Sequence, residues 1–320
     1  MPPHSDLQCK LYPFGSQSEL KFVVVCSFFE GKLLLSRHKL RSTWETQGGH
    51  IEADETPLQA ARRELFEESG VTDAILTPVC DYLGYTDEGS AYGAVFRADI
   101  QQLGSLPDSE MQEVSLFDSL PAELTYPNVT PTLFAEAQNL DPLAPSTLLN
   151  MAAAEGYSKA ALIPTMDLIF DPSFRPYCEE NLCGKYGINY SCPPDCGSPD
   201  EMKERIMAHP QALVLQSTWD IPDWRDETMV KAAKAAHNKA QLNILSAIRQ
   251  QKASAVMAGA SGCNLCPVCA IVDGEACRYP DLKFSCLSAY CVYVKALAER
   301  CGMDYDYKEG KLSFYGLITF

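Results

Sequence analysis

The sequence predicts two α/β domains in one chain, and three observations lead to this prediction. The chain has 320 residues, about the length of two domains of ordinary size. Eleven of its 14 cysteines lie between residues 178 and 301, so the composition changes along the chain. Residues 139–146, NLDPLAPS, interrupt the pattern with prolines and small polar residues. We therefore expect a first domain at 1–140, a linker at 141–150 and a second domain at 151–320.

Two short apolar runs predict a β-hairpin near the start of the first domain. Residues 22–26 and 32–36 are rich in valine and leucine. Glu30 and Gly31 separate them, and a glycine at this place is typical of a tight turn. The first domain is therefore expected to contain a sheet.

The residues that follow predict an amphipathic helix with well-defined ends. Thr56 and Pro57 are typical of an N-cap and a first helical position, and Gln59 completes a capping box. Gly70 stands where a helix often ends in a left-handed residue. Between these ends, apolar side chains recur at helical spacing and are expected to face a core: Leu58, Ala61 and Leu65.

Three glutamates share another face of this helix. Glu64, Glu67 and Glu68 have the spacing i, i+3 and i+4, so their carboxylates lie close enough to repel one another. A hard divalent cation such as Mg²⁺ or Mn²⁺ would offset this repulsion through oxygen ligands. Arg63, four residues before Glu67, can hold that carboxylate by a charge-assisted hydrogen bond. The alternative is an acidic face that is merely solvated, but the caps and Arg63 favour a metal site.

Residues 49–71 resemble the signature of the Nudix hydrolases. They read GHIEADETPLQAARRELFEESGV and fit the pattern G-x5-E-x7-R-E-(apolar)-x-E-E-x-G-(apolar). The nine fixed places are filled by Gly49, Glu55, Arg63, Glu64, Leu65, Glu67, Glu68, Gly70 and Val71. The resemblance implies an α/β/α sandwich with a mixed sheet over roughly residues 10–140.

The same resemblance implies a role for each residue of the site. The metal ligands would be Glu64, Glu67, Glu68 and the backbone of Gly48, and Glu55 and Arg63 would orient them. Gln47 stands where the family commonly has a proline before two glycines. We therefore expect a less rigid loop at this point.

Nudix hydrolases cleave a nucleoside diphosphate linked to another group, and the resemblance implies this reaction here. The metal would clamp the diphosphate and lower the pKa of an attacking water. Candidates for the general base are Glu67 and, in a later loop, Glu110 or Glu113. The expected catalytic residues are therefore Glu55, Arg63, Glu67 and Glu113. The domain has no insertion of the kind that extends sugar-nucleotide hydrolases, so the expected substrate is a nucleoside triphosphate such as an oxidised purine nucleotide.

Basic and aromatic side chains near this segment are weaker candidates for substrate contacts. Arg37, His38, Lys39 and Arg41 lie in LLSRHKLRSTW and are candidates for the phosphates, although solvated side chains are the simpler interpretation. Stacking on a base is as consistent as core packing with the aromatic residues: Trp44, Tyr82, Tyr85 and Tyr92.

The cysteines of the second domain fall into two groups. The first is Cys178, Cys183, Cys192 and Cys196, and the second is Cys263, Cys266, Cys269 and Cys277. Because the sequence shows no signal peptide, we expect a cytoplasmic, reducing compartment, where clustered cysteines are more often metal ligands than disulfides. The spacing CxxCxxC with a further cysteine is typical of a [4Fe–4S] cluster. Zinc is the alternative, since four thiolates also form a closed tetrahedral site, and simple burial is the third interpretation.

Further motifs accompany these cysteines. They are Tyr186-Gly187, Cys192-Pro193-Pro194 and, after CxxCxxC, Cys277-Arg278-Tyr279-Pro280. With them the chain resembles, from about residue 155 to its end, a family of predicted metal-binding proteins, domain of unknown function 2284. The resemblance implies an iron–sulfur cluster but no established reaction. We expect a sensing or electron-carrying role, with a redox partner.

The region between and beyond the cysteine groups predicts helices. Residues 226–258 contain no proline and are rich in alanine, lysine, glutamine and leucine, which predicts one long helix. This helix would return the second cysteine group to the neighbourhood of the first. Cys286, Cys291 and Cys301 lie beyond the motifs; metal ligation is one interpretation of them, and packing of a helix that carries them is the favoured one.

Charge and hydropathy exclude several classes of function. The net charge is −16, and residues 1–140 alone carry 9 basic against 21 acidic side chains, so a basic surface for a nucleic-acid polymer is not expected. No run approaches the ~20 apolar residues that span a membrane. The expected partner is therefore a small-molecule nucleotide. The alternative function is a regulatory protein that binds a nucleotide while its cluster domain carries the main activity, but the complete set of Nudix glutamates favours hydrolysis.

Overall fold

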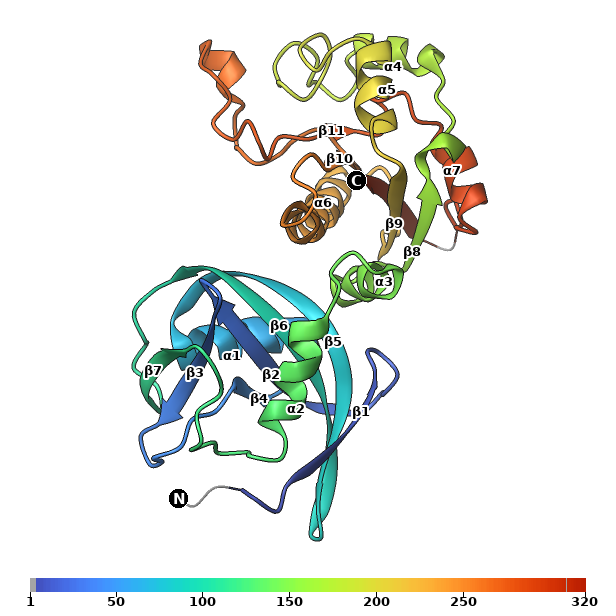
Figure 1. Ribbon diagram of the computed structural model, residues 1–320. Helices are drawn as coiled ribbons and strands as arrows, with labels where there is room; N and C mark the ends of the chain where they lie inside the picture. Colours follow the sequence, from blue (N-terminus) through green and yellow to red (C-terminus); the bar gives the residue numbers. More distant parts are fainter. Residues whose placement is uncertain (1–3, 309) are drawn as a thin grey trace. The chain divides into compact units, whose positions relative to one another are not determined.

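The computed structural model describes residues 4–308 and 310–320, and these divide into two compact units. The first unit is Met1–Ala154 and the second is Glu155–Phe320. Each unit has a sheet and helices of its own (Figure 1). Helix α3 (Pro145–Ala154) belongs to the first unit, and it occupies most of the segment where the sequence predicts a linker at 141–150.

The first unit is built on a seven-stranded mixed sheet. Its strands run in the order β1-β5-β6-β2-β3-β7, with β4 paired to β2. Strands β2 and β6 are parallel, and the other pairs are antiparallel. The strands are β1 (Gln8–Pro13), β2 (Leu20–Phe29), β3 (Lys32–His38), β4 (Gln47–His50), β5 (Val71–Thr86), β6 (Gly89–Leu103) and β7 (Met111–Phe117). The predicted hairpin is β2–β3, and both residues of its turn, Glu30 and Gly31, have positive φ.

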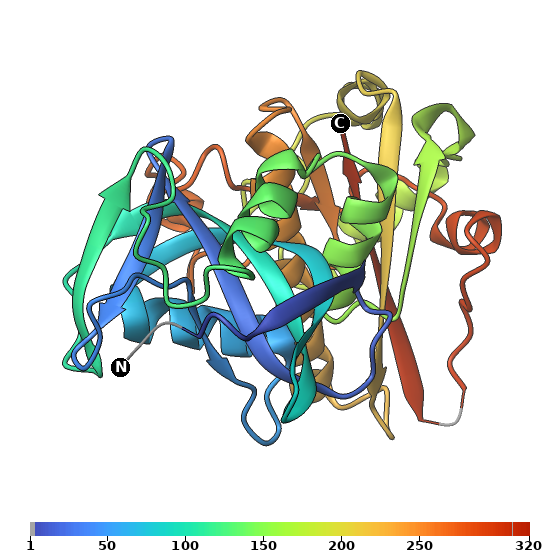
Figure 2. The ribbon, with the colours of Figure 1, turned by 60° about the horizontal axis from the view of Figure 1, so that its bottom comes forward.

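Helices of the first unit lie on both faces of this sheet (Figure 2), and the side chains of its strands pack against them in two cores. Val23 and Val25 of β2 belong to the core under helix α1 (Pro57–Ser69). Val24 and Cys26 point the other way, into the core with helix α2 (Thr130–Asn139). Because strand side chains alternate with period 2, each face buries its own apolar set. The predicted α/β/α sandwich with a mixed sheet is confirmed.

The second unit is built on a five-stranded sheet with the order β11-β10-β12-β9-β8. Strands β10 and β11 are parallel, and the other pairs are antiparallel. The strands are β8 (Lys159–Pro164), β9 (Gln211–Asp220), β10 (Val256–Gly259), β11 (Ser285–Cys286) and β12 (Lys311–Thr319). The helices are α4 (Arg175–Glu179), α5 (Pro199–Met207), α6 (Glu227–Arg249) and α7 (Val294–Arg300), with short 3-10 turns at Thr165–Asp167, Pro172–Phe174 and Ala270–Asp273. The predicted α/β class is confirmed.

The long helix of the second unit is shorter than the sequence predicts. Helix α6 begins after Asp226, whose carboxylate accepts the N–H groups of Thr228 and Met229, and it ends at Arg249. Residues 256–259 form strand β10 instead, because they pair with β12 and β11. Within residues 4–308 and 310–320, no helix is long and apolar enough to cross a membrane.

Candidate functional site

Local capping fixes the two ends of helix α1. The Thr56 hydroxyl accepts the N–H of Gln59 at 3.3 Å, and the Gln59 side chain accepts the N–H of Thr56 at 2.8 Å. At the other end Gly70 has φ 75° and donates its N–H to the carbonyl of Phe66 at 2.8 Å. The predicted caps are confirmed. These caps determine where helix α1 begins and ends.

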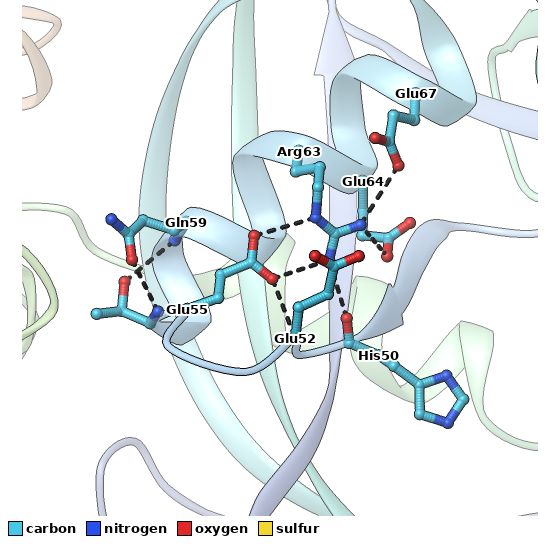
Figure 3. A network of polar contacts seen from close by, with 8 residues as sticks. His50, Glu52, Glu55, Gln59, Arg63, Glu64 and Glu67 are labelled. Carbon is cyan, nitrogen blue, oxygen red and sulfur yellow. Dashed lines mark hydrogen bonds and ion pairs between the residues drawn. The ribbon is translucent and has the colours of Figure 1, made fainter.

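Arg63 gathers the carboxylates of this segment around one guanidinium (Figure 3). It binds Glu55 with two bonds, from Nε at 3.0 Å and from Nη2 at 2.9 Å. Its Nη1 donates to Glu64 at 2.7 Å and to Glu67 at 3.3 Å. Nη2 also donates to the carbonyl of His50 at 3.0 Å, which ties the helix to β4. The predicted contact between Arg63 and Glu67 is present, and the planar fork fixes the direction of each carboxylate.

Two glycines allow strand β4 to lie against the carboxylates of α1. A Cβ atom on Gly49 would stand 2.6 Å from Cδ of Glu64, so only glycine leaves room for that carboxylate. A Cβ on Gly48 would overlap the carbonyl of Val23 in β2, the strand that pairs with β4. The backbone N–H of Gly48 donates to Oε2 of Glu68 at 2.7 Å. Close backbone approach is therefore the reason for glycine at both positions.

The pKa values of the carboxyl groups of Glu55, Glu64 and Glu68 are shifted in different directions. Burial raises the pKa of Glu68 to about 9, although the Gly48 N–H bond acts in the opposite direction. Burial also raises the pKa of Glu64, with Arg63 opposing it. The hydrogen bonds from Arg63 lower the pKa of Glu55. Two clustered carboxyl groups that resist ionisation fit a divalent cation, because a nearby positive charge favours their charged forms.

Gln47 is fixed by side-chain hydrogen bonds rather than by backbone stiffness. It is completely buried. Its side chain accepts from Ser27 at 2.6 Å and donates to Ser36 at 2.8 Å. The Ser36 hydroxyl in turn donates to the carbonyl of Glu68 at 2.8 Å. These bonds join β2, β3, β4 and α1 at the position where the sequence predicts a less rigid loop.

The candidates for the general base lie in different surroundings. Glu113 is on strand β7, where Arg37 forms an ion pair with it and Ser115 donates to it at 3.2 Å. Glu110, just before β7, is one of the charges that raise the pKa of Glu68, so it lies within electrostatic reach of the helix. Its carboxylate stands 3.6 Å from Nε2 of His38.

Glu45 belongs to the same electrostatic neighbourhood, and the sequence interpretation missed it. Its side chain is only 6 % exposed and is paired with Arg41. It is also one of the charges that raise the pKa of Glu68. No motif includes Glu45. Its neighbours, Trp44 and Thr46, give no local signal that could have singled it out.

The basic residues of the segment at 37–41 are engaged in ion pairs within the first unit. Arg37 pairs with Glu113 and Arg41 with Glu45. Lys39 lies 3.4 Å from Asp108 and also donates to the carbonyl of Ser109. Among the aromatic candidates, Tyr82 and Trp44 pack in the core beside α2, Tyr85 is exposed and Tyr92 lies edge-on to Tyr12.

A cavity of about 1190 Å³ in the second unit is bordered by cysteines from both predicted groups. Seven of the eight predicted cysteine ligands line it: Cys178, Cys183, Cys192, Cys263, Cys266, Cys269 and Cys277. Basic side chains also line it: Lys185, Lys231, Lys234, Arg278 and Lys283. The two groups, about seventy residues apart in sequence, therefore face one space.

Hydrogen bonds join the loops that carry the two groups. The N–H of Cys263 donates to the hydroxyl of Ser191 at 2.8 Å, and the Asn189 amide donates to the carbonyl of Cys263 at 3.0 Å. A Cβ on Gly262 would lie 3.0 Å from Sγ of Cys192. Glycine there lets the second loop approach the thiol of the first.

The eighth predicted ligand, Cys196, lies elsewhere. It is 4 % exposed and belongs to a core cluster with Met202 and Ile206 of α5. Its Sγ donates to Sδ of Met202 at 3.4 Å and accepts from Nη1 of Arg175 at 3.7 Å. Cys196 does not line the cavity.

The donor set around the cavity is suited to thiophilic metals. All 14 cysteines are free. Burial raises the pKa of Cys178 to about 11 and of Cys192 to about 12, with neighbouring thiols adding to the effect. Within the described residues, no three His, Cys, Asp or Glu side chains are grouped closely enough to hold a single ion, neither the thiols here nor the carboxylates of α1. Binding of a metal at either place would therefore draw these side chains together. The thiols around the cavity suit zinc or an iron–sulfur cluster.

Comparison with protein families assigns both units. The family described as NUDIX domain matches residues 20–132. The family described as predicted metal-binding protein (DUF2284) matches residues 161–320, half of the chain. The two matches fall within the first and the second unit respectively.

Each of three individual relatives covers less than half of this chain. Phosphatase NudJ of Escherichia coli strain K12 is 39 % identical over 70 residues, which is 22 % of this chain and 37 % of the relative. The chain thus spans little more than a third of the length of this curated relative. Among solved structures, the Bacillus subtilis pyrophosphohydrolase BsRppH is 26 % identical, with a TM-score of 0.37, over 43 % of this chain and 96 % of its own. A MutT NUDIX hydrolase from Burkholderia pseudomallei is 21 % identical, with a TM-score of 0.31, over 38 % and 98 %.

Proposed function

Because this chain belongs to the family of predicted metal-binding proteins DUF2284 and carries a NUDIX domain ahead of that part, we propose a metal-dependent pyrophosphohydrolase joined to a metal-binding domain. The first unit would hydrolyse a nucleoside diphosphate linked to another group. The observation that carries this proposal is the convergence of Glu55, Glu64 and Glu67 on Arg63. An acidic face that is merely solvated would not require one arginine that binds three carboxylates.

Each residue of the first unit has a distinct part in the proposed reaction. Glu64, Glu67, Glu68 and the backbone of Gly48 would hold Mg²⁺ or Mn²⁺, both of which prefer oxygen ligands. When bound, the metal supplies charge stabilisation on the phosphoryl oxygens and a lower pKa for a bound water. Arg63 keeps the ligands in one orientation, and Glu55 anchors Arg63 through its two bonds.

The general base would be a carboxylate that is free to accept a proton from water. The carboxylate of Glu67 is half exposed and accepts a long hydrogen bond from Arg63 at 3.3 Å. Glu110 lies within electrostatic reach of Glu68 and is largely exposed. Glu113 is held by Arg37 and Ser115. These surroundings favour Glu67 or Glu110 over Glu113, although all three stay candidates.

We propose a nucleoside triphosphate, such as an oxidised purine nucleotide, as the substrate. The support is the compactness of the first unit, whose seven strands are joined by short connections. Exposed Tyr85 and half-buried Tyr92, on strands β5 and β6, are available for stacking on a base.

The second unit would hold an iron–sulfur cluster, with zinc as the alternative, and would sense redox state or carry electrons to a partner. Its support is the ring of thiols and basic side chains around one cavity. The basic groups suit a cluster because thiolate-bound clusters carry net negative charge. Free thiols in this number persist in a reducing compartment, so we propose a cytoplasmic location.

The test of the hydrolase is phosphate and pyrophosphate release across a panel of nucleotides and dinucleotides with Mg²⁺, using protein purified without oxygen. Glu67→Gln should lower kcat by about 10²–10⁴-fold. Glu88→Gln is the matched control, because Glu88 lies in the exposed turn between β5 and β6. Nucleotide binding without turnover, with a change in the visible spectrum of the second unit, would favour the regulatory alternative instead.

A further inference from the structure

Cys286 lies on the short strand β11 at the edge of the cysteine cavity. Strand β11 pairs in parallel with β10, which places Cys286 opposite Gly259. Gly259 is four residues before Cys263, so this pairing brings Cys286 next to the start of the second cysteine group. Its side chain lines the cavity, and the N–H of Ala289 donates to its Sγ at 3.4 Å.

Cys286 shares the cavity with the cysteines of both predicted groups. The first group contributes three of the cysteines that line it, Cys178, Cys183 and Cys192, and the second group contributes all four of its members. Cys286 is the eighth cysteine of the lining, so the cavity holds enough thiols for two sets of four.

The other cysteines of the second unit that lie outside the second group do not line the cavity. Cys196 is held between Met202 and Arg175 in the core of the unit. Cys291 is 2 % exposed, and Cys301 follows helix α7, and neither lines the cavity. All four cysteines of the second group line the cavity, so that group is complete without an outside member.

We infer that Cys286, and not Cys196, is the fourth ligand of the first cysteine set, so that two four-cysteine sites flank one cavity. The first site consists of Cys178, Cys183, Cys192 and Cys286, and the second of Cys263, Cys266, Cys269 and Cys277. This inference rests on the proposed metal-binding role of the second unit. Each set has the four thiolates that one [4Fe–4S] cluster or one zinc requires.

The test is metal content and spectroscopy of the full chain, purified and reconstituted without oxygen using iron and sulfide. Two [4Fe–4S] clusters give about eight iron atoms per chain in the unaltered protein. Cys286→Ser and Cys286→Ala should lose about half of the iron and one of two signals in the electron paramagnetic resonance spectrum after reduction. Cys196→Ser should keep all of it, and Cys301→Ser is a second control. If zinc is the metal, about two atoms per chain should fall to about one in the Cys286 variants.

The outcomes separate this inference from the proposed function. No iron or zinc in the unaltered protein would overturn the metal-binding role as a whole. Full metal content in the Cys286 variants, with loss in Cys196→Ser, would overturn only the assignment of Cys286. Circular dichroism of each variant shows whether a loss of metal reflects a loss of fold.

A second measurement needs no substitution at Cys286. The loaded protein and the protein stripped by a chelator are treated with iodoacetamide, and each cysteine is read by mass spectrometry. Cys286 should be protected only while metal is bound, together with Cys178 and Cys183. Cys301 should react equally in both states. Equal reactivity of Cys286 in both states would contradict its role as a ligand.

Discussion

The carboxylate of Glu68, near the end of helix α1, accepts the backbone N–H of Gly48 in strand β4 at 2.7 Å. One helical turn earlier, Glu64 lies against Gly49 in the space a side chain would fill. Residues four apart on a helix lie above one another, so a strand with two adjacent glycines can run beside both carboxylates. The shape of the proposed metal site is therefore set by backbone packing.

Gly49→Ala should disable the first unit while leaving it folded. The new methyl group would displace the Glu64 carboxylate, and a shift of about 1 Å in such a group costs about 10²-fold in rate. Nucleotide hydrolysis and Mn²⁺ affinity, measured together, check this expectation. Gly89→Ala is the matched control, since nothing lies within 4 Å of a Cβ placed there. Unchanged Mn²⁺ affinity in Gly49→Ala would show that Glu64 is not a ligand.

Arg63→Lys should weaken metal binding although the positive charge is kept. Lysine cannot reproduce the fork that binds Glu55 twice and also reaches Glu64. Changes in groups that orient metal ligands cost about 10–100-fold in metal affinity. Titration calorimetry with Mn²⁺ measures the effect, and Arg62→Lys on the exposed side of α1 serves for comparison. Affinity within two-fold of the unaltered protein would remove Arg63 from this role.

Gln47→Leu should destabilise the first unit by about 2–3 kcal/mol. The substitution leaves the buried hydroxyl of Ser27 without its acceptor and Ser36 without one of its donors. A two-unit chain has no single free energy of unfolding, so hydrogen exchange of the amides of β2 and β4 is the measurement. Gln102→Leu, on an exposed position of β6, should change exchange by no more than about 0.5 kcal/mol.

His237 should make the second unit sensitive to acid. The ring is 1 % exposed, and burial lowers its pKa to about 3. Nδ1 of His237 is hydrogen-bonded to the hydroxyl of Ser217 at 2.7 Å, and that hydroxyl also accepts the indole N–H of Trp219 at 2.9 Å. Among the described residues, Nε2 of His237 has no hydrogen-bond partner. A protonated ring would therefore carry a buried N–H without an acceptor.

The sign of the pH effect follows from the lowered pKa of His237. Above pH ~6.5 both the folded and the unfolded forms are neutral, and the stability is complete. As the pH falls from ~6.5 towards 3, only the unfolded chain takes up the proton, so stability falls by up to about 1.4 kcal/mol per pH unit. Hydrogen exchange of α6 amides between pH 7 and pH 5 measures this slope. His237→Gln should flatten it, leaving a smaller slope from His209, whose pKa burial also lowers. An unchanged slope would contradict the assignment.

Features that depend on neighbours in sequence could be predicted well. Thr56, Gln59 and Gly70 act within one turn of the helix ends, so their spacing alone identifies the caps. The contact between Arg63 and Glu67 follows from the helical repeat. The hairpin of β2 and β3 follows from a glycine turn between two apolar runs.

Features that depend on strands distant in the sequence could not be predicted. Residues 256–259 have the composition of a helix end, but β12, some sixty residues later, pairs with them as a strand. Gln47 is unusual by its type at that position, yet its bonds to Ser27 and Ser36 arise only when three strands meet. Likewise, Cys196 is close to Cys192 in the sequence, and nothing local shows that it turns towards Met202 while Cys286 lines the cavity.

Helix α3 also decides where the chain can be divided. It contacts β5, Leu148 is fully buried, and Ala154 packs against the core beneath α1. A fragment that ends at residue 140 would lack helix α3, so the side chains of β5 that this helix contacts would be exposed to solvent. A fragment that begins at residue 151 would carry the last four residues of helix α3 as an apolar N-terminal segment. A division after Ala154 keeps helix α3 with the first unit and follows the boundary between the two compact units.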